Sequence, residues 1–311
     1  MINKNNQLQT LKGFRDILPE QKQQRDFVIN KVKETFELFG FAPMETPTLE
    51  YASLLLDKYG KEADKSVYTF KDRGGRKIGL RFDQTVPAAR VLAQYQQQLP
   101  KFFRRYQIQN VFRSDKPQKG RFREFTQCDI DIFGAASPLA DAEIIACTYQ
   151  AFKNVGFKKI ILKINDRQIL FKVLKPFANN QVNTLSIIQT IDKLDKKSTN
   201  KVIKELTNKG LEKKTAKQAL DKIKKANISQ NLKEIINLSQ NLGVPQKVLK
   251  FSPTLARGLD YYTGMIFEVI LPELKAGSCA GGGRYDNLIK QLGGIDIPAV
   301  GIAFGLSLIH I

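Results

Sequence analysis

Polar side chains recur at every second position in the segment REFTQCDIDIFG, residues 123–134. Along an extended strand, successive side chains alternate between two faces, so Gln127, Asp129 and Asp131 share one face with Phe125. Such a face could line a polar pocket. A half-buried strand with a solvated outer face would show the same pattern, and the segment taken alone fits both interpretations.

The segment LRFDQT, residues 80–85, offers a second polar face. If this segment is extended, Arg81, Asp83 and Thr85 lie on one side of it. Two acidic faces in one domain could together hold a cationic group such as an α-ammonium.

Three arginines bracket a lysine-rich turn in FRSDKPQKGRFRE, residues 112–124. Arg113, Arg121 and Arg123 would lie at strand ends beside a basic loop, where guanidinium groups suit bidentate hydrogen bonds to phosphate. A solvated hairpin tip explains the same residues equally well.

A further set of reactive side chains precedes a strand-like segment in LARGLDYYTGMIFEV, residues 255–269. It contains Arg257, Asp260 and Tyr262, and CAGGGRYDNLI follows it closely. The glycine run is neither a GxGxxG fingerprint nor a P-loop, since no GK[ST] follows it. Taken alone, it fits a generic turn as well as the close approach of a ligand.

Composition excludes several kinds of chemistry. The 311 residues include a single histidine, His310, second from the end. Zinc sites built on histidine, Ser-His-Asp triads and histidine general bases are therefore excluded unless this tail supplies them. Cys128, Cys147 and Cys279 have no CxxC spacing and fit free thiols in a reducing compartment. The sequence shows no apolar run of bilayer length and no signal-like start, so we expect a cytoplasmic protein without a membrane span.

The net charge of +20 is concentrated in one block. Residues 151–250 hold 22 Lys and Arg against 7 Asp and Glu, whereas the remaining 211 residues hold 28 against 23. A basic patch of this kind binds phosphate backbones through counterion release, although solvated lysine-rich helices are also common.

Hydrophobic spacing predicts the elements that must position these side chains. Val28, Val32 and Phe36 recur at helical spacing, which predicts an amphipathic helix over 20–40. Alternation with period two over 101–133 is typical of antiparallel strands. The helix and the strands together indicate an α+β domain.

The pattern of apolar and charged residues changes near Asn165. Three short helices with apolar stripes and lysine-rich outer faces are predicted between this point and residue 250. After Pro253 the pattern is again typical of β-strands. We therefore predict an α+β domain built mainly on an antiparallel sheet flanked by helices. A small basic helical module at 166–250 interrupts it.

These segments, in this order, resemble the histidyl-tRNA synthetases, a family of class II aminoacyl-tRNA synthetases. The resemblance runs from LKGFRDILP at 11–19 to PAVGIAFG at 298–305. The first helix and the region of Pro47 are similar to class II motif 1, and VFRSDKPQKGRFREFTQCDIDIFG is similar to motif 2. LARGLDYYTG and AGGGRYDNL are similar to two signatures of the histidine enzymes.

The resemblance implies a class II synthetase-like fold with a divided catalytic domain. Residues 1–165 would form its first part, 251–305 its second part, and 166–250 an insertion domain that contacts the tRNA acceptor arm. The implied reaction is ATP-dependent activation of histidine to histidyl-adenylate, followed by transfer to histidine tRNA. The implied partners are L-histidine, ATP with Mg²⁺, histidine tRNA and a second copy of the chain, bound through motif 1.

The resemblance also assigns roles to the phosphate-binding arginines. Arg113 and Arg257 would be the catalytic residues, holding the α-phosphate of ATP from two sides, and Arg121 would reach toward the terminal phosphates. The attacking group is a carboxylate that is already ionised at neutral pH, so activation needs no general base. The task is positioning and charge stabilisation at the α-phosphate.

The histidine substrate would be held by six side chains in the family pattern. Asp83, Thr85 and Gln127 would bind its α-amino group. Asp131 and Tyr262 would hydrogen-bond the imidazole edges, and Tyr285 would complete the pocket. Many family members carry glutamate at the positions of Asp83 and Asp131, so this chain implies a slightly different pocket.

The sequence departs from the family pattern after Gly305. Motif 3 would continue with an acidic residue and an arginine, but Ser307 and Leu308 stand there. We therefore expect 306–311 to be a non-native tail and the anticodon-binding domain to be absent.

The main alternative is the synthetase-like regulatory subunit of ATP phosphoribosyltransferase in histidine biosynthesis, which also lacks an anticodon-binding domain. Those paralogues tend to lose the arginines of motif 2 and of the RGLDYY segment, whereas Arg113 and Arg257 are present here.

Overall fold

The computed structural model describes residues 8–56, 65–116, 122–257, 261–274 and 277–306. Eight strands form the main sheet: β1 (Ala42–Pro43), β5 (Phe103–Phe112), β6 (Glu124–Phe133), β7 (Ile161–Asp166), β8 (Leu249–Phe251), β9 (Met265–Ile270), β10 (Ala280–Arg284) and β11 (Ala299–Gly305). Their order is β1-β5-β6-β11-β10-β9-β7-β8. The edge pairs β1–β5 and β7–β8 are parallel and the five internal pairs are antiparallel. The predicted α+β fold on a mainly antiparallel sheet is confirmed.

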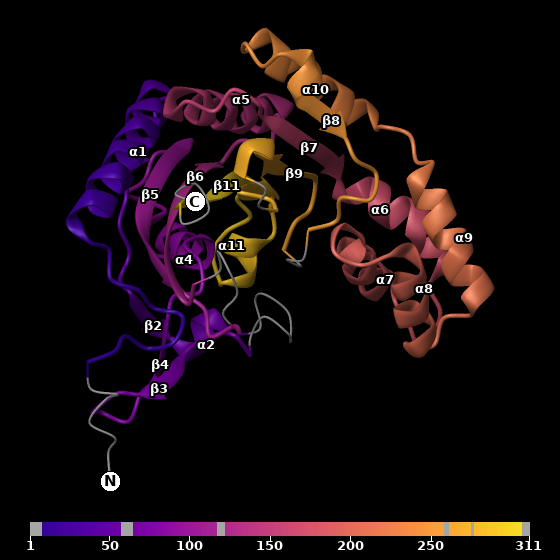
Figure 1. Ribbon diagram of the computed structural model, residues 1–311, viewed down its shortest axis with the longest axis horizontal. Helices are drawn as coiled ribbons and strands as arrows, with labels where there is room; N and C mark the ends of the chain where they lie inside the picture. The colour runs from indigo at the N-terminus through magenta and orange to yellow at the C-terminus, as the bar shows by residue number, and fades with distance from the viewer. Residues whose placement is uncertain (1–7, 57–64, 117–121, 258–260, 275–276, 307–311) are drawn as a thin grey trace.

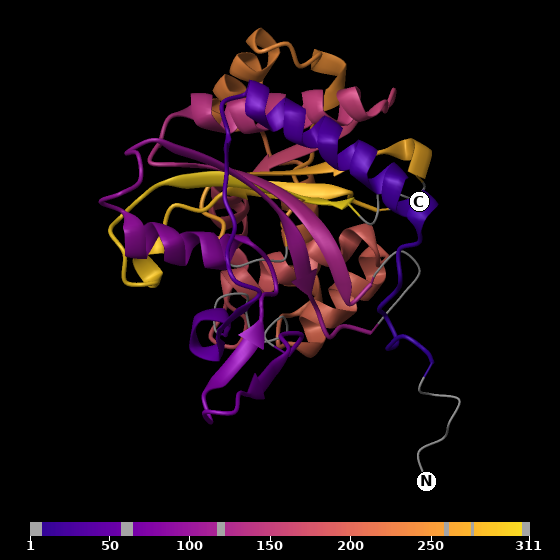
Figure 2. The same cartoon turned by 90° about the vertical axis from the view of Figure 1, so that its left-hand side faces the viewer.

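One face of this sheet is covered by three long helices, α1 (Pro19–Leu38), α5 (Pro138–Val155) and α10 (Gln230–Asn241), which lie together above it in Figure 2. The helix predicted over 20–40 is therefore present. Phe36 of α1 and Phe152 of α5 both pack on Phe304 of β11, with ring centroids 5.5 and 5.1 Å apart. This face of the sheet is the apolar one.

The opposite face is covered by shorter elements, which lie below the sheet in Figure 2. These are α4 (Thr85–Tyr95), α11 (Leu288–Gln291) and a small sheet with strand order β2-β4-β3, next to α2. The small sheet is made of β2 (Leu49–Tyr51), β3 (Thr69–Lys71) and β4 (Lys77–Leu80), and α2 spans Ala52–Leu55. None of the helices in the described ranges is both long and apolar enough to span a bilayer.

Four helices between β7 and β8 pack mainly on one another: α6 (Arg167–Leu174), α7 (Thr184–Ile191), α8 (Thr199–Asn208) and α9 (Lys213–Lys224). The three predicted helices correspond to α8, α9 and α10, and the prediction missed α6 and α7. Each of the missed helices has only eight residues. Two turns show too little periodicity to distinguish a helix from a short buried strand.

Helix α10 does not pack with this group but lies on α5 (Figure 1), where Leu232 and Ile235 join the core of the main sheet. Strand β8 likewise belongs to the main sheet. We therefore propose that the insertion domain comprises α6–α9, a shorter span than 166–250. Of the tail at 306–311, Leu306 is buried in the main core, and the remaining residues lie outside the described part.

Candidate active site

The pocket-forming face of β5 and β6 carries three consecutive polar cross-strand pairs. Arg105 lies opposite Asp131, Gln107 opposite Asp129, and Gln109 opposite Gln127. On the other side of β6, strand β11 places only glycine or alanine opposite the three β6 residues. The small residues leave room above the sheet, and the polar pairs form the floor of a site.

Asp131 is held by two buried side chains. Its Oδ2 forms an ion pair with Nη2 of Arg105 at 2.5 Å, and its Oδ1 accepts a hydrogen bond from the Tyr285 hydroxyl. The side chains of Arg105 and Asp131 are 0% and 3% exposed. Burial raises the pKa of Asp131, while the charge of Arg105 and the Tyr285 hydrogen bond act in the opposite direction. A Cβ at Gly301 would overlap Oδ1 of Asp131, so this carboxylate requires the glycine beside it.

Asp129 lies one pair along the same face and is 1% exposed. Burial is the largest of the effects that raise the pKa of Asp129 well above its ordinary value, and the carboxylates of Asp131 and Asp83 add to it. Arg105 and Arg113 lower it. Asp129 therefore belongs to the same electrostatic cluster although it does not line the cavity.

The segment around Asp83 is not extended as predicted, because α4 begins at Thr85. Oδ1 of Asp83 accepts a hydrogen bond from the backbone N–H of Val86 at 3.1 Å, which bends the chain into the first turn. Gln84 fixes this turn to the sheet by donating to the carbonyl oxygens of Gln109 and Gln127. Both Asp83 and Thr85 face the cavity as a result.

Arg81 does not share their side. Its Nη1 donates to the Thr46 carbonyl oxygen at 2.7 Å and its Nε donates to that of Asn110 at 2.6 Å. Arg81 thus braces the backbone behind the site, and the prediction that it faces the same way as Asp83 and Thr85 is wrong. A helix start, unlike a strand, does not keep alternate residues on one side.

Arg113 stands just beyond the end of β5 at one end of the site. Its guanidinium lies over the rings of Phe82 and Phe125, 4.2 and 5.2 Å from their centroids, and its Nε donates to the Phe82 carbonyl oxygen at 3.2 Å. Arg123, in contrast, turns to the Asp115 carbonyl oxygen and does not line the cavity. Arg121 and most of the predicted KPQKG turn lie outside the described residues.

Arg257 approaches from a different element. Its Nη1 is 2.7 Å from Oε1 of Glu268 on β9, and its guanidinium lies 6.0 Å from the ring centroid of Tyr262. Burial by itself lowers the pKa of Arg257, but the electrostatic effects of Tyr262 and Glu268 outweigh it, so the pKa is raised and the side chain stays charged. A Cβ at Gly281 would overlap the guanidinium, so this first glycine of the GGG run provides clearance for Arg257.

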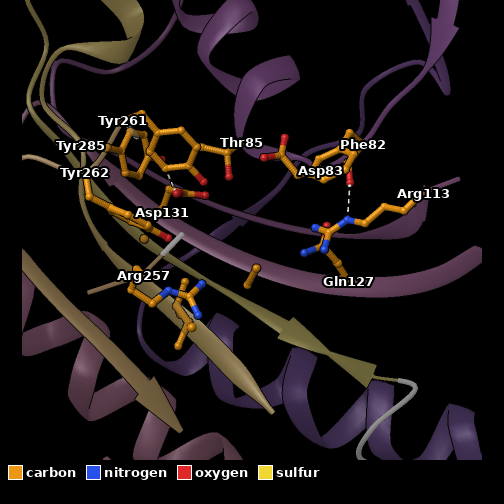
Figure 3. A pocket seen from close by; sticks show the side chains of 14 residues that line it. Phe82, Asp83, Thr85, Arg113, Gln127, Asp131, Arg257, Tyr261, Tyr262 and Tyr285 are labelled. Carbon is orange, nitrogen blue, oxygen red and sulfur yellow. Dashed lines mark hydrogen bonds between the residues drawn. The ribbon is translucent and has the colours of Figure 1, made fainter. Parts of the chain in front are cut away.

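These side chains surround a cavity of about 260 Å³ (Figure 3). Its lining comprises Phe82, Asp83, Thr85, Arg113, Gln127, Asp131, Arg257, Tyr261, Tyr262, Gly281, Tyr285, Gly301, Ile302 and Ala303. The structure thus brings together all the described residues to which the family resemblance assigns ATP or histidine binding, whereas Arg81, Arg123 and Asp129 do not line the cavity. Among the lining residues, Oε1 of Gln127 is buried and has no hydrogen-bond partner in the described part of the chain.

Sequence reasoning missed two residues that organise this site, Arg105 and Glu268. Arg105 occupies a period-two position on β5, and this alternation was the available signal for it. Glu268 gave no such signal, because its contact with Arg257 depends on how the loop before β9 folds back on that strand. Within the described ranges no group of three acidic, cysteine or histidine side chains is arranged to hold a metal ion.

The fold matches solved structures of known proteins. A crystal structure of histidyl-tRNA synthetase from Nostoc sp. PCC 7120 superposes with a TM-score of 0.81 at 31% identity and covers 97% of this chain and 74% of that chain. A structure described as an ATP phosphoribosyltransferase regulatory subunit/histidyl-tRNA synthetase from Bacillus halodurans superposes with a TM-score of 0.80 at 23% identity, covering 97% and 82%. The sheet and its flanking helices are those of the class II aminoacyl-tRNA synthetases.

Sequence comparison narrows this class to one family. The family model for histidyl-tRNA synthetase matches residues 13–309. A histidine–tRNA ligase of Gloeobacter violaceus is 38% identical over 347 aligned positions, which cover 97% of this chain and 74% of the relative. The chain belongs to the histidyl-tRNA synthetase family and spans about three quarters of the length of this relative.

Proposed function

We propose that this chain activates histidine with ATP to form histidyl-adenylate and transfers the histidyl group to histidine tRNA. The observation that carries the proposal is the polarity of the cavity. Its lining combines the carboxylate and amide groups of Asp83, Gln127 and Asp131 with two guanidinium groups: Arg113 lies beside Asp83, and Arg257 lies on the other side of the cavity (Figure 3). Histidine bound with its ammonium group at Asp83 and Gln127 would place its carboxylate between the two guanidinium groups.

The carboxylate and amide groups fit the substrate's donors. The carboxylate of Asp83 and Oε1 of Gln127, which accepts no hydrogen bond from the described residues, are acceptors for an α-ammonium group. Asp131 and Tyr262 are available to the imidazole edges, and Tyr285 holds Asp131 in place. Because Asp131 already accepts from Tyr285 and pairs with Arg105, its orientation is fixed before the ring arrives.

The two guanidinium groups fit the chemistry of adenylation. An oxygen of the histidine carboxylate attacks the α-phosphorus of ATP, the new carbonyl-O–P bond forms, and the bond to the bridging oxygen breaks to release pyrophosphate. No proton moves to or from the nucleophile, so no general base is required. Arg113 and Arg257, on opposite sides of this point, would neutralise charge that develops on the phosphoryl oxygens.

Mg²⁺ would enter with ATP rather than at a protein site of its own. In the described ranges no cluster of carboxylates is present to hold the ion without phosphate. Mg²⁺ commonly keeps several waters and binds through one or two carboxylates plus substrate phosphates. It would supply charge neutralisation at the terminal phosphates.

The exposed lysines of α9 supply a surface for the second substrate. Lys213, Lys214, Lys217 and Lys224 are exposed, whereas Ala216, Ala219 and Leu220 face the interior. We propose that this face contacts the tRNA backbone and that two copies of the chain associate through the motif 1 region. RNA affinity that falls steeply with added salt would fit such a contact.

The test is histidine-dependent ATP–pyrophosphate exchange with this chain and with a version extended by the C-terminal part of a relative. Exchange that Arg257→Ala abolishes and Arg104→Ala preserves supports the proposal. Arg104 is a suitable control because it pairs with Glu143 on the other face of β5. Histidine binding by the extended protein without any exchange would contradict it.

That second result would favour a regulatory subunit of ATP phosphoribosyltransferase. The observation in its favour is the fold shared with the Bacillus halodurans protein, whose description names such a subunit. Binding of histidine with modulation of an added phosphoribosyltransferase would then be the activity to measure.

A further inference from the structure

Arg257 has an unusual backbone conformation for a residue with a side chain. Its φ is +58°, and it is the one non-glycine residue in the described ranges with a positive φ. The left-handed region is disfavoured for L-residues and persists where surrounding contacts impose it. The conformation decides where the guanidinium points, so the contacts that impose it act on the site.

A side chain near the end of β7 binds the loop that leads to Arg257. Asn165, which is fully buried, donates through Nδ2 to the carbonyl oxygens of Pro253 at 3.1 Å and Leu255 at 2.8 Å. These bonds fix the approach of the chain toward Arg257. They do not reach Arg257 itself.

Arg167 completes this attachment. It is 1% exposed, and its Nη1 donates to the carbonyl oxygen of Ala256 at 3.0 Å and to that of Arg257 at 3.3 Å. Its own backbone N–H donates to the Gly264 carbonyl oxygen at 2.8 Å, which ties down the chain beyond the tyrosines. One residue therefore holds the backbone on both sides of the segment that carries Arg257 and Tyr262.

The side-chain contacts of Arg257 cannot replace this attachment. The ion pair with Glu268 restrains the guanidinium, and Gly281 leaves room for it. Neither contact fixes the φ of Arg257. With its carbonyl groups unrestrained, an arginine held by Glu268 and by the hydrogen bond between its backbone and Asp192 could still turn away from the cavity.

Arg167 also links the site to the helical insertion. It is the first residue of α6, and Asp166 before it caps that helix and accepts a hydrogen bond from the Ser229 hydroxyl. A shift of α6 relative to the sheet would therefore move the carbonyl groups of Ala256 and Arg257, which precede and follow the φ and ψ bonds of Arg257.

We propose that Arg167 is a positioning residue for adenylation. By binding the carbonyl groups of Ala256 and Arg257 it holds the left-handed backbone of Arg257 and so aims the guanidinium into the cavity. The effect of Arg167 on adenylation rests on the proposed function. The effect of Arg167 on the conformation of Arg257 rests on the hydrogen bonds alone.

The first test is a double-mutant cycle on pyrophosphate exchange. Arg167→Met keeps the apolar stem and removes the donors. It should lower the exchange kcat by about 100-fold, the scale of a misplacement near 1 Å, and leave the Kd for histidine within about 3-fold because Asp83, Gln127 and Asp131 are untouched. In an Arg257→Gln background the same change should cost less than about 3-fold, since the group that it positions is already gone. Arg167→Lys should restore part of the rate.

Ser229→Ala is the matched control. It removes the hydrogen bonds of the hydroxyl with Asp166 and with the backbone N–H of Leu232 at the same junction without touching residues 253–257, so kcat should stay within about 2-fold of wild type. Equal losses from Arg167→Met in both backgrounds, or a loss that follows the melting temperature alone, would overturn the positioning role.

A second readout does not depend on activity. The NMR signal of the Arg257 side-chain Nε–H, assigned by its absence in Arg257→Gln, should shift or broaden in Arg167→Met and remain in place in Ser229→Ala. An unchanged signal in Arg167→Met overturns the proposal. If the wild-type chain shows no exchange, that result contradicts the proposed function but not the positioning role of Arg167. The NMR signal alone then decides whether Arg167 holds Arg257.

Discussion

The ion pair between Arg105 and Asp131 gives a quantitative prediction for Arg105→Leu. Both side chains are almost completely buried, and the atoms Nη2 and Oδ2 are 2.5 Å apart. The substitution leaves the carboxylate of Asp131 in a low-dielectric site with the Tyr285 hydroxyl as its remaining protein partner among the contacts described above. Removing one member of a buried pair is far more costly than removing both, because the other charge stays uncompensated.

The expected loss in the free energy of unfolding at neutral pH is about 3–5 kcal/mol. For a chain of this length a loss of 1 kcal/mol lowers Tm by about 2 °C, so Tm should fall by roughly 6–10 °C. Urea unfolding followed by circular dichroism measures the free energy directly. The matched control is Arg104→Leu on the same strand. Its pair with Glu143 is 34% and 22% exposed, and the cost should stay near 1 kcal/mol.

The loss should also depend on pH with a defined sign. Burial already raises the pKa of Asp131 above 3.8 in the folded protein, and loss of Arg105 raises it further. A carboxyl with a higher pKa in the folded state than in the unfolded state binds its proton preferentially when folded, so stability increases as the pH falls. The deficit of Arg105→Leu should therefore narrow between neutral pH and the ordinary carboxyl pKa.

Two results would refute this reasoning. One is a cost below about 1 kcal/mol, the value of a solvated pair. The other is a deficit that does not change with pH. As an internal check, Asp131→Asn should destabilise the wild-type protein and stabilise the Arg105→Leu variant, because in the second case it removes a charge without a cationic partner.

Further predictions concern the glycine run and Asp83. Gly281→Ala places its Cβ against the movable guanidinium of Arg257, so thermal melting should change little while pyrophosphate exchange falls by about 10²–10³-fold. Gly282→Ala meets the backbone of β11 instead and should destabilise by about 1–3 kcal/mol in urea unfolding; equal stability of the two variants would contradict this distinction. Asp83→Asn keeps an acceptor for the Val86 N–H but loses the charge, so calorimetry should show histidine binding weakened by roughly 10–100-fold at unchanged Tm; unchanged affinity would remove Asp83 from the site.

Much of the framework could be predicted from local spacing. Alternation along 123–134 placed Gln127, Asp129 and Asp131 on one face, and the structure has them on one face of β6. The helical stripe of Val28, Val32 and Phe36 likewise predicted α1. These predictions succeeded because a strand or a long helix fixes the direction of each side chain from its neighbours in the chain.

Local spacing was insufficient where a short element or a change of element intervenes. The helix start at Thr85 reoriented Arg81 relative to Asp83, and the eight-residue helices α6 and α7 showed too few turns to be detected. The packing of α10 on α5 was also beyond the sequence, since an apolar stripe does not say which partner covers it.

The sequence by itself thus determined which residue types are present and which of them share a face of a strand or helix. Only the tertiary structure decided their partners. Arg105 pairs with Asp131, Glu268 pairs with Arg257, and Arg167 donates to the carbonyl oxygens of Ala256 and Arg257. The physical reason is that these contacts join segments whose separation is fixed by strand register and loop closure, and neither is encoded in the spacing of adjacent residues.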